Sequence, residues 1–275
     1  MHVRVGHSPD PDDAFMVWAI AERALDLRGF EIELVPADIQ TLNGWAVEGR
    51  LEATAMSVGA YPGVQDTYRL LGHGASLGEG YGPVVIAREP IDLDRLAGMR
   101  VAVPGPQTTA FLTARLALPA FEPVQLDFER IMDAVASGDV AAGVVIHEGQ
   151  LTWEQEGFAR VLDLGAWWEG ETGMPLPLGA VAMRRDVPED RARDLSAVLK
   201  EAVAVGMEHR EAALAYAIEY GRGIAPDLND RFVAMYVNDL TLDYGERGRA
   251  AVALLLERGA AAGLLPSPVA LDFLD

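Results

Sequence analysis

A histidine and a glutamate end a short apolar run in the segment AAGVVIHEGQ, residues 141–150. The small and β-branched residues before His147 predict a buried strand that places the imidazole at its end. A neutral imidazole can act as a general base near pH 7, and apolar surroundings favour its unprotonated form. Glu148 could orient this base or cap the helix that follows. The alternative is a hydrogen-bonded core histidine, so the pattern gives a candidate base and leaves the structural interpretation open.

The N-terminal segment GHSPDPDDAF, residues 6–15, carries a second group of polar residues. Ser8 and Asp10 are residue types that begin helices, and free N–H groups at a helix start could hold an anion or a polar oxygen. We therefore nominate Ser8 and Asp10 as substrate-binding residues, although the acids could equally serve as caps or lie in solvent. Asp10, Asp12 and Asp13 lack the spaced ligand pattern of a known metal loop, and we therefore predict no metal site.

Hydroxyl groups follow two further predicted strands. Ser57 ends an apolar run, and its hydroxyl could donate and accept hydrogen bonds at the edge of a cleft. Thr108 and Thr109 fall in the first turn of a predicted helix, where hydroxyls and free N–H groups could form a cradle for a carboxylate or a phosphate. The alternatives are a satisfied core serine and plain N-capping. The Gly-Lys-Ser/Thr element of a P-loop and the Gly-x-Ser-x-Gly elbow of hydrolases are both missing from the sequence.

These residues need strands and helices to position them, and the sequence predicts two consecutive βαβαβ sets. The first set has strands at 3–6, 30–37 and 52–61, with helices at 12–25 and 41–50, the latter capped by Thr41. The second has strands at 99–103, 122–128 and 140–147, with helices at 107–118 and 129–139. This order of elements predicts parallel sheets. An extended return segment at 173–186 precedes helices at 189–220, 227–239 and 245–262.

The two sets predict an α/β protein of two lobes, with the second lobe inserted into the first. We expect residues 1–87 in the first lobe, 88–176 in the inserted lobe, and 177–275 back in the first. A ligand should bind in the cleft between the lobes, at loops that follow strand carboxyl ends. Trp167 and Trp168 lie near the crossing between lobes, where they could wall an aromatic ligand pocket or pack at the hinge.

Composition excludes several classes of function. The net charge of −20 offers no basic stripe to nucleic acid or to an anionic membrane surface. The absence of cysteine excludes disulfides, thiolate metal sites and a cysteine nucleophile. The first residues do not resemble a signal peptide, and the apolar runs are too short to span a bilayer. We therefore expect a cytoplasmic protein, and the sequence does not specify its oligomeric state.

Five long motifs occur in register: SPDPDDAFMVWAI, DIQTLNGWAVEGR, PGPQTTA, GVVIHEGQLTW and DLGAWWEGETGMPLPLGA. Together they resemble the 1,4-dihydroxy-6-naphthoate synthase family of the futalosine route to menaquinone. The resemblance implies a periplasmic-binding-protein type II fold used as an enzyme. It also implies a lyase that converts cyclic dehypoxanthine futalosine into 1,4-dihydroxy-6-naphthoate with loss of a small sugar-derived fragment. Neither a metal nor a redox cofactor is implied.

The resemblance also assigns residues. The catalytic histidine of the family falls on His147, and its paired threonines fall on Thr108 and Thr109. The segment that contacts substrate at the third strand falls on Ala55, Met56 and Ser57. The expected partner is a small-molecule substrate that carries a carboxylate. Many members read Ser-Pro-Cys-Pro-Asn-Asp-Thr-Phe near the N-terminus, whereas this chain has Asp10 and Asp12 in place of the cysteine and the asparagine. These two carboxylates would disfavour a strongly anionic group beside them.

Two other functions are compatible with the same fold. A solute-binding protein for a small carboxylate would carry a leader sequence and would need no base. Chorismate dehydratase, a sibling in the same superfamily, would supply the start of the pathway. The His147-Glu148 pair and the GAWWEGETGMPLPLG segment favour the synthase.

Overall fold

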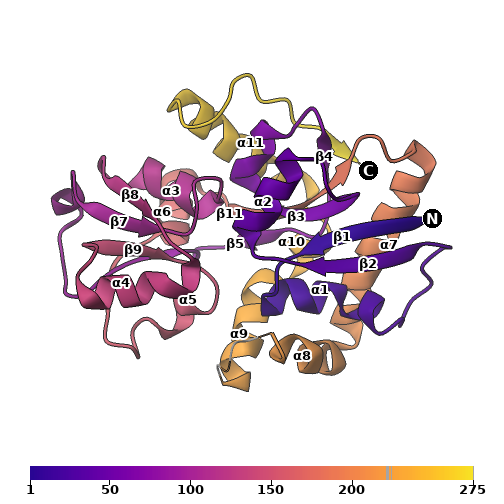
Figure 1. Ribbon diagram of the computed structural model, residues 1–275, viewed down its shortest axis with the longest axis horizontal. Coiled ribbons are helices and arrows are strands. Elements are labelled where there is room, and N and C mark those ends of the chain that lie inside the picture. Colours follow the sequence, from indigo (N-terminus) through magenta and orange to yellow (C-terminus); the bar gives the residue numbers. More distant parts are fainter. Residues whose placement is uncertain (221–222, 224, 275) are drawn as a thin grey trace.

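Two mixed β-sheets form the centres of two lobes that lie side by side (Figure 1). The computed structural model describes residues 1–220, 223 and 225–274. The larger sheet has the strand order β12-β4-β11-β3-β1-β2, and β5 also pairs with β11. The smaller sheet has the order β10-β6-β9-β7-β8.

The strands of the larger sheet are β1 (His2–His7), β2 (Glu31–Pro36), β3 (Ala53–Ser57), β4 (Tyr68–Leu71), β5 (Ser76–Gly78), β11 (Leu176–Arg184) and β12 (Phe273–Leu274). Those of the smaller sheet are β6 (Val84–Ala87), β7 (Arg100–Val103), β8 (Glu122–Gln125), β9 (Ala142–Val145) and β10 (Ala159–Asp163). The smaller sheet thus takes its strands from residues 84–163. The lobe boundaries expected at 87/88 and 176/177 stay a prediction.

The helices cover both sheets. They are α1 (Pro11–Ala21), α2 (Ile39–Val47), α3 (Thr109–Ala117), α4 (Ile131–Ser137), α5 (Gly149–Thr152), α6 (Leu164–Thr172), α7 (Glu189–Glu208), α8 (Arg210–Ile218), α9 (Pro226–Tyr236), α10 (Asp239–Leu242) and α11 (Gly245–Ala261). Within residues 1–220, 223 and 225–274, no helix combines the length and the apolar character needed to cross a membrane.

The predicted βαβαβ sets are confirmed, but the sheets are not wholly parallel as expected. In the larger sheet β1 pairs parallel with β2 and β3, and in the smaller sheet β7 pairs parallel with β8 and β9. The return strand β11 runs antiparallel to β3, β4 and β5, and β6 runs antiparallel to β9 and β10. Short strands outside the two sets therefore complete both sheets.

Some element bounds differ from the prediction for local reasons. The first helix ends at Ala21, four residues before the expected end at 25. The second begins after Asp38, whose side chain accepts a hydrogen bond from the Thr41 N–H at 3.0 Å, so the predicted cap at Thr41 is wrong. The single helix expected at 189–220 is two helices, because His209 leaves the helical conformation with φ −108° and ψ 41°.

An apolar core fixes α1 against the larger sheet and α7. Phe15 on α1, Val3 on β1 and Val198 on α7 have no exposed surface and belong to one cluster of packed side chains. Since α1 begins directly after the loop at the end of β1, this core also fixes the position of the acidic residues in its first turn.

The segment that leads from β5 to β6 touches the first turn of α6 backbone to backbone. A Cβ atom placed on Gly165 would lie 2.0 Å from the carbonyl carbon and oxygen of Tyr81, so only glycine fits there. Trp168 on α6 is fully buried, and its indole N–H donates to the Pro175 carbonyl at 3.1 Å. The burial of Trp168 supports the interpretation that Trp167 and Trp168 pack at the hinge.

The core beneath α1 can be tested with two valine truncations. Val198→Ala removes two methyl groups from a fully buried position and should lower the free energy of unfolding by about 2–3 kcal/mol. Val47→Ala makes the same change at a residue that is 57% exposed and should stay within about 0.5 kcal/mol of wild type. Urea unfolding followed by circular dichroism measures both, and equal losses would contradict this account of the core.

Candidate functional site

A pocket with a cavity volume of about 110 Å³ lies between the lobes and opens to solvent. The residues lining this pocket include every site residue nominated from the sequence, namely Ser8, Asp10, Ala55, Met56, Ser57, Thr108, Thr109 and His147. The structure brings these residues together, and their contact with a substrate stays a prediction.

His147 lies in a sharp turn just after β9, which ends at Val145 and not at residue 147 as expected. Its φ angle is +58°, a left-handed backbone conformation that few non-glycine residues adopt and that costs about 1–3 kcal/mol. The Phe128 ring lies edge-on to the imidazole, with the two ring centroids 4.1 Å apart. The imidazole therefore lies at the wall of the pocket on an unfavourable backbone conformation, which contacts with neighbouring residues must stabilise.

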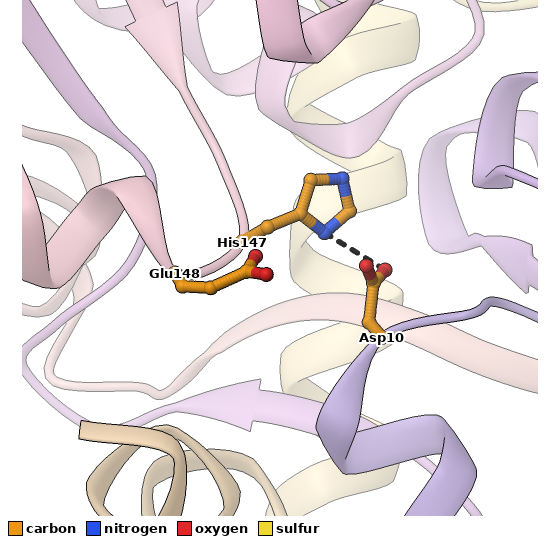
Figure 2. Close-up of side chains that lie close together, drawn as sticks. All are labelled: Asp10, His147 and Glu148. Atoms are coloured by element: carbon orange, nitrogen blue, oxygen red, sulfur yellow. Dashed lines mark ion pairs between the residues drawn. The ribbon is translucent and has the colours of Figure 1, made fainter. Parts of the chain in front are cut away.

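The imidazole meets a carboxylate from the other lobe. His147 Nδ1 lies 2.8 Å from Asp10 Oδ2, and both side chains are buried (Figure 2). Asp10 directly precedes α1, yet its side chain makes no capping hydrogen bond to that helix. Of the two roles that the sequence left open for Glu148, the cap is not formed, because the Glu148 side chain makes no capping hydrogen bond to α5. The acid at the ring nitrogen is Asp10, which the sequence had proposed as a substrate ligand.

A buried glutamine supports the turn that carries His147. The Gln150 N–H donates to the His147 carbonyl at 3.0 Å. The Gln150 side-chain amide forms two hydrogen bonds in one orientation: its nitrogen donates to the Gly82 carbonyl at 2.6 Å, and its oxygen accepts from the His147 N–H at 3.2 Å. The hydroxyl of Tyr236 lies 2.7 Å from the same amide. Residues before β6, after β9 and at the end of α9 thus converge on one turn.

Three carboxylates gather at the start of α1. The Ser8 hydroxyl donates to Asp10, and the Ser8 N–H donates to Asp13 at 2.7 Å. Asp12 accepts from the Ser76 hydroxyl at 3.1 Å. Burial raises the pKa of Asp12 to about 6, and the nearby Asp10 carboxylate adds to the rise. Burial, together with the neighbouring Asp12, also raises the pKa of Asp13 well above its usual value.

Ser57 is held by a residue that sequence reasoning missed. The Asn43 side chain on α2 accepts from the Ser57 N–H at 2.8 Å and donates to the Ser57 Oγ at 3.0 Å. Because the Ser57 oxygen accepts from this amide, its own hydroxyl hydrogen is directed elsewhere and can be donated to a ligand. An asparagine within a helix gave no signal that would separate it from an ordinary polar position.

The paired threonines join three parts of the chain. Thr109 Oγ1 donates to the Leu178 carbonyl on β11 at 2.7 Å and accepts from the Gly59 N–H at 3.0 Å. Thr108 Oγ1 donates to the Gly105 carbonyl and caps α3 by accepting from the Phe111 N–H. The hydroxyls are thus used within the protein. Anion binding would fall to the first backbone N–H groups of α3, which begins at the pocket.

The aromatic side of the pocket comes from α9. Phe232 and Tyr236 line it, and their rings contact each other with centroids 5.2 Å apart. Among the described residues that line the pocket none is a tryptophan, so of the two interpretations left open for Trp167 and Trp168 the aromatic wall is not supported. Two aromatic residues one turn apart on an amphipathic helix look like core residues in the sequence, which is why they were not nominated.

One group of side chains could meet at a cation. Asp10, His147 and Glu148 offer ligand atoms that lie within 4.8 Å of one another, a donor set that zinc or a similar divalent ion accepts. In the structure Asp10 and His147 contact each other directly. The expectation that the site needs no metal and no cofactor stays a prediction.

Comparison with known proteins identifies the family. A family model described as menaquinone biosynthesis matches residues 3–261. The chain is 43% identical over 267 residues to 1,4-dihydroxy-6-naphthoate synthase from Thermus thermophilus, and the match covers 97% of each chain. The chain belongs to this synthase family. The family predicted from the sequence motifs is thereby confirmed.

Solved structures confirm the fold of this synthase-family chain. A protein from Archaeoglobus fulgidus superposes with a TM-score of 0.92 at 44% identity, covering 96% of this chain and 98% of that one. The alkanesulfonate-binding protein from Xanthomonas axonopodis pv. citri superposes with a TM-score of 0.73 at 17% identity, covering 98% and 95%. The second likeness shows the predicted two-lobed, periplasmic-binding-protein type II-like fold.

The raised pKa of Asp12 predicts an unusual dependence of stability on pH. An aspartate titrates near 3.9 in the unfolded chain, so between pH 4 and 6 the native state binds more protons than the unfolded state. This group therefore makes the free energy of unfolding fall as pH rises through that window. Asp12→Asn should remove the fall, about 2–3 kcal/mol relative to wild type. Urea unfolding of both proteins at pH 4 and pH 7 measures it, and stability curves that stay parallel would refute the assignment.

The Thr109 hydroxyl predicts a second stability effect. Thr109→Val keeps the shape but leaves the buried Gly59 N–H and the partly buried Leu178 carbonyl without this partner, so it should cost about 1–3 kcal/mol. Thr109→Ser keeps the hydroxyl and is the matched control, with a smaller loss. Thermal and urea unfolding compare the two variants. Equal stability of the valine and serine variants would show that the hydroxyl does not join these segments.

Proposed function

We propose that this chain is a carbon–carbon lyase that converts cyclic dehypoxanthine futalosine into 1,4-dihydroxy-6-naphthoate and a small sugar-derived fragment, with His147 as general base. The observation that carries the proposal is the buried imidazole at the wall of the interlobe pocket, in a chain of the synthase family. A cytoplasmic location belongs to the same proposal, because the relatives of this chain are biosynthetic enzymes.

The charges in the pocket suggest how a substrate with a carboxylate would lie. Asp10, Asp12 and Asp13 all line the pocket, and each of them would repel an anion in its ionised form. The amino-terminal end of α3 carries the positive end of a helix dipole and free N–H groups, both of which favour an anion. We therefore place the substrate carboxylate at Thr109 and Ala110, and the hydroxyl-bearing part near the acids.

The proposed reaction needs water to be excluded and one proton to be moved. The lobes close on the substrate, and Ser57 donates its hydroxyl hydrogen to a substrate oxygen. His147 removes a proton, the spiro-like ring opens by carbon–carbon cleavage, and formation of the aromatic naphthol drives the reaction forward. The electrons are redistributed within a single substrate, which is why we propose chemistry without a metal or a redox cofactor.

Turnover of the purified protein tests this proposal. Wild type should form 1,4-dihydroxy-6-naphthoate from cyclic dehypoxanthine futalosine, followed by absorbance and mass. His147→Ala should lose about 10²–10⁴-fold in turnover, the usual contribution of a placed general base, without loss of the fold. His2→Ala is the matched control, because His2 is half exposed and pairs with Glu33 far from this chemistry. It should turn over like wild type.

Each other outcome has a meaning. An unchanged rate in His147→Ala would remove the base from the proposal. Conversion of chorismate in place of the futalosine would indicate the dehydratase sibling. Binding without conversion of either compound would indicate a solute-binding protein.

A further inference from the structure

Asp10 does not cap the helix α1 that it directly precedes. It sits at the residue before α1, where an aspartate normally accepts a hydrogen bond from the first turn, but its side chain makes no such bond. Its Oδ2 instead lies 2.8 Å from His147 Nδ1 and accepts the Ser8 hydroxyl. Only 4% of Asp10 is exposed, so this carboxylate is directed inward by more than one contact.

The two partners belong to different lobes. Asp10 follows β1 of the larger sheet, and His147 follows β9 of the smaller sheet. Their contact therefore crosses the pocket and exists only where the lobes are together. Figure 2 shows Asp10 and His147 approaching from opposite sides, with the second ring nitrogen pointing away from the carboxylate.

We infer that Asp10 is a positioning residue that fixes the tautomer of His147 across the lobe interface. An ionised carboxylate can only accept, so the proton of the neutral ring resides on Nδ1 and the lone pair on Nε2. The base is thus Nε2, and the ring cannot rotate without losing the contact. The same carboxylate stabilises the imidazolium that forms once the ring has taken a proton. This inference rests on the proposed function, in which His147 is the base.

Other charges surround the ring but do not replace this contact. Asp12 lies on the first turn of α1 and acts on His147 electrostatically, and Glu148 is the next residue in the chain. Both are acidic and would favour a positive ring, yet a charge at a distance does not select one nitrogen over the other. A direct contact to Nδ1 does, and Asp10 supplies it. Glu148→Gln is therefore the matched control, since it removes a neighbouring charge and keeps Asp10.

The direct test is the tautomer of His147 in substrate-free protein. The chain has five histidines, so the His147 imidazole signals in ¹⁵N NMR can be assigned by their absence in His147→Ala. At a pH where the ring is neutral, wild type and Glu148→Gln should show a protonated Nδ1. Asp10→Asn, whose amide can donate to Nδ1, and Asp10→Ala, which removes the contact, should both shift the proton to Nε2. A protonated Nε2 in wild type, or no shift in either Asp10 variant, would overturn the inference.

Turnover gives the second readout. Asp10→Asn should lower kcat by about 10²–10⁴-fold, as loss of a carboxylate that orients a catalytic histidine does, with little change in KM. A rise in KM at unchanged kcat would mean that Asp10 binds substrate and does not position the base. Failure of the proposed function appears differently: wild type would not convert the futalosine, while the tautomer measurement would still support the contact between Asp10 and His147.

Discussion

The contact between Asp10 and His147 is the constraint on which the rest of the site depends. Removing a charged group from water costs several kcal/mol, and the cost is offset only where hydrogen bonds and a close partner replace the lost hydration. The Ser8 hydroxyl and the imidazole supply these for Asp10. The two partners stand on different lobes, so every element that fixes one of them also fixes the distance across the pocket. The packed core of α1 and the turn after β9 are therefore parts of one arrangement.

The turn that carries His147 lowers the stability of the folded protein. A left-handed backbone at His147 is unfavourable for any residue with a Cβ, and a glycine at this position would avoid the cost. The chain instead keeps a histidine there and supports it with Gln150 and Tyr236, two buried residues that the turn needs in order to hold its shape. Strain that is supported by several elements is typical of functional sites, where side-chain direction matters more than backbone preference.

The sequence predicted the parts of the fold that have local signals. Parallel strands joined by helices follow from periodicity, and residues such as Ser57, Thr109 and His147 follow because the carboxyl ends of parallel strands meet at one edge. Strands of three or four residues such as β5 and β6 were missed, since their pairing is set by partners far along the chain. Asn43 and Tyr236, which lie on helices, were missed as site residues for the same reason. Nothing local indicates that Asp10 meets His147, because no periodicity connects the two lobes.

The acids beside this contact are better explained by chemistry than by folding. A buried carboxyl group whose pKa is raised lowers the stability of the native protein as pH rises above the pKa of the unfolded chain, so Asp12 and Asp13 at the start of one helix work against stability near neutral pH. Exposed acids would give the chain its negative charge at no such cost. These acids line the pocket, where they repel anions from one end while the dipole of α3 attracts them at the other. The pocket thus has a polarity, which under the proposed function would favour one orientation of a substrate with a single carboxylate.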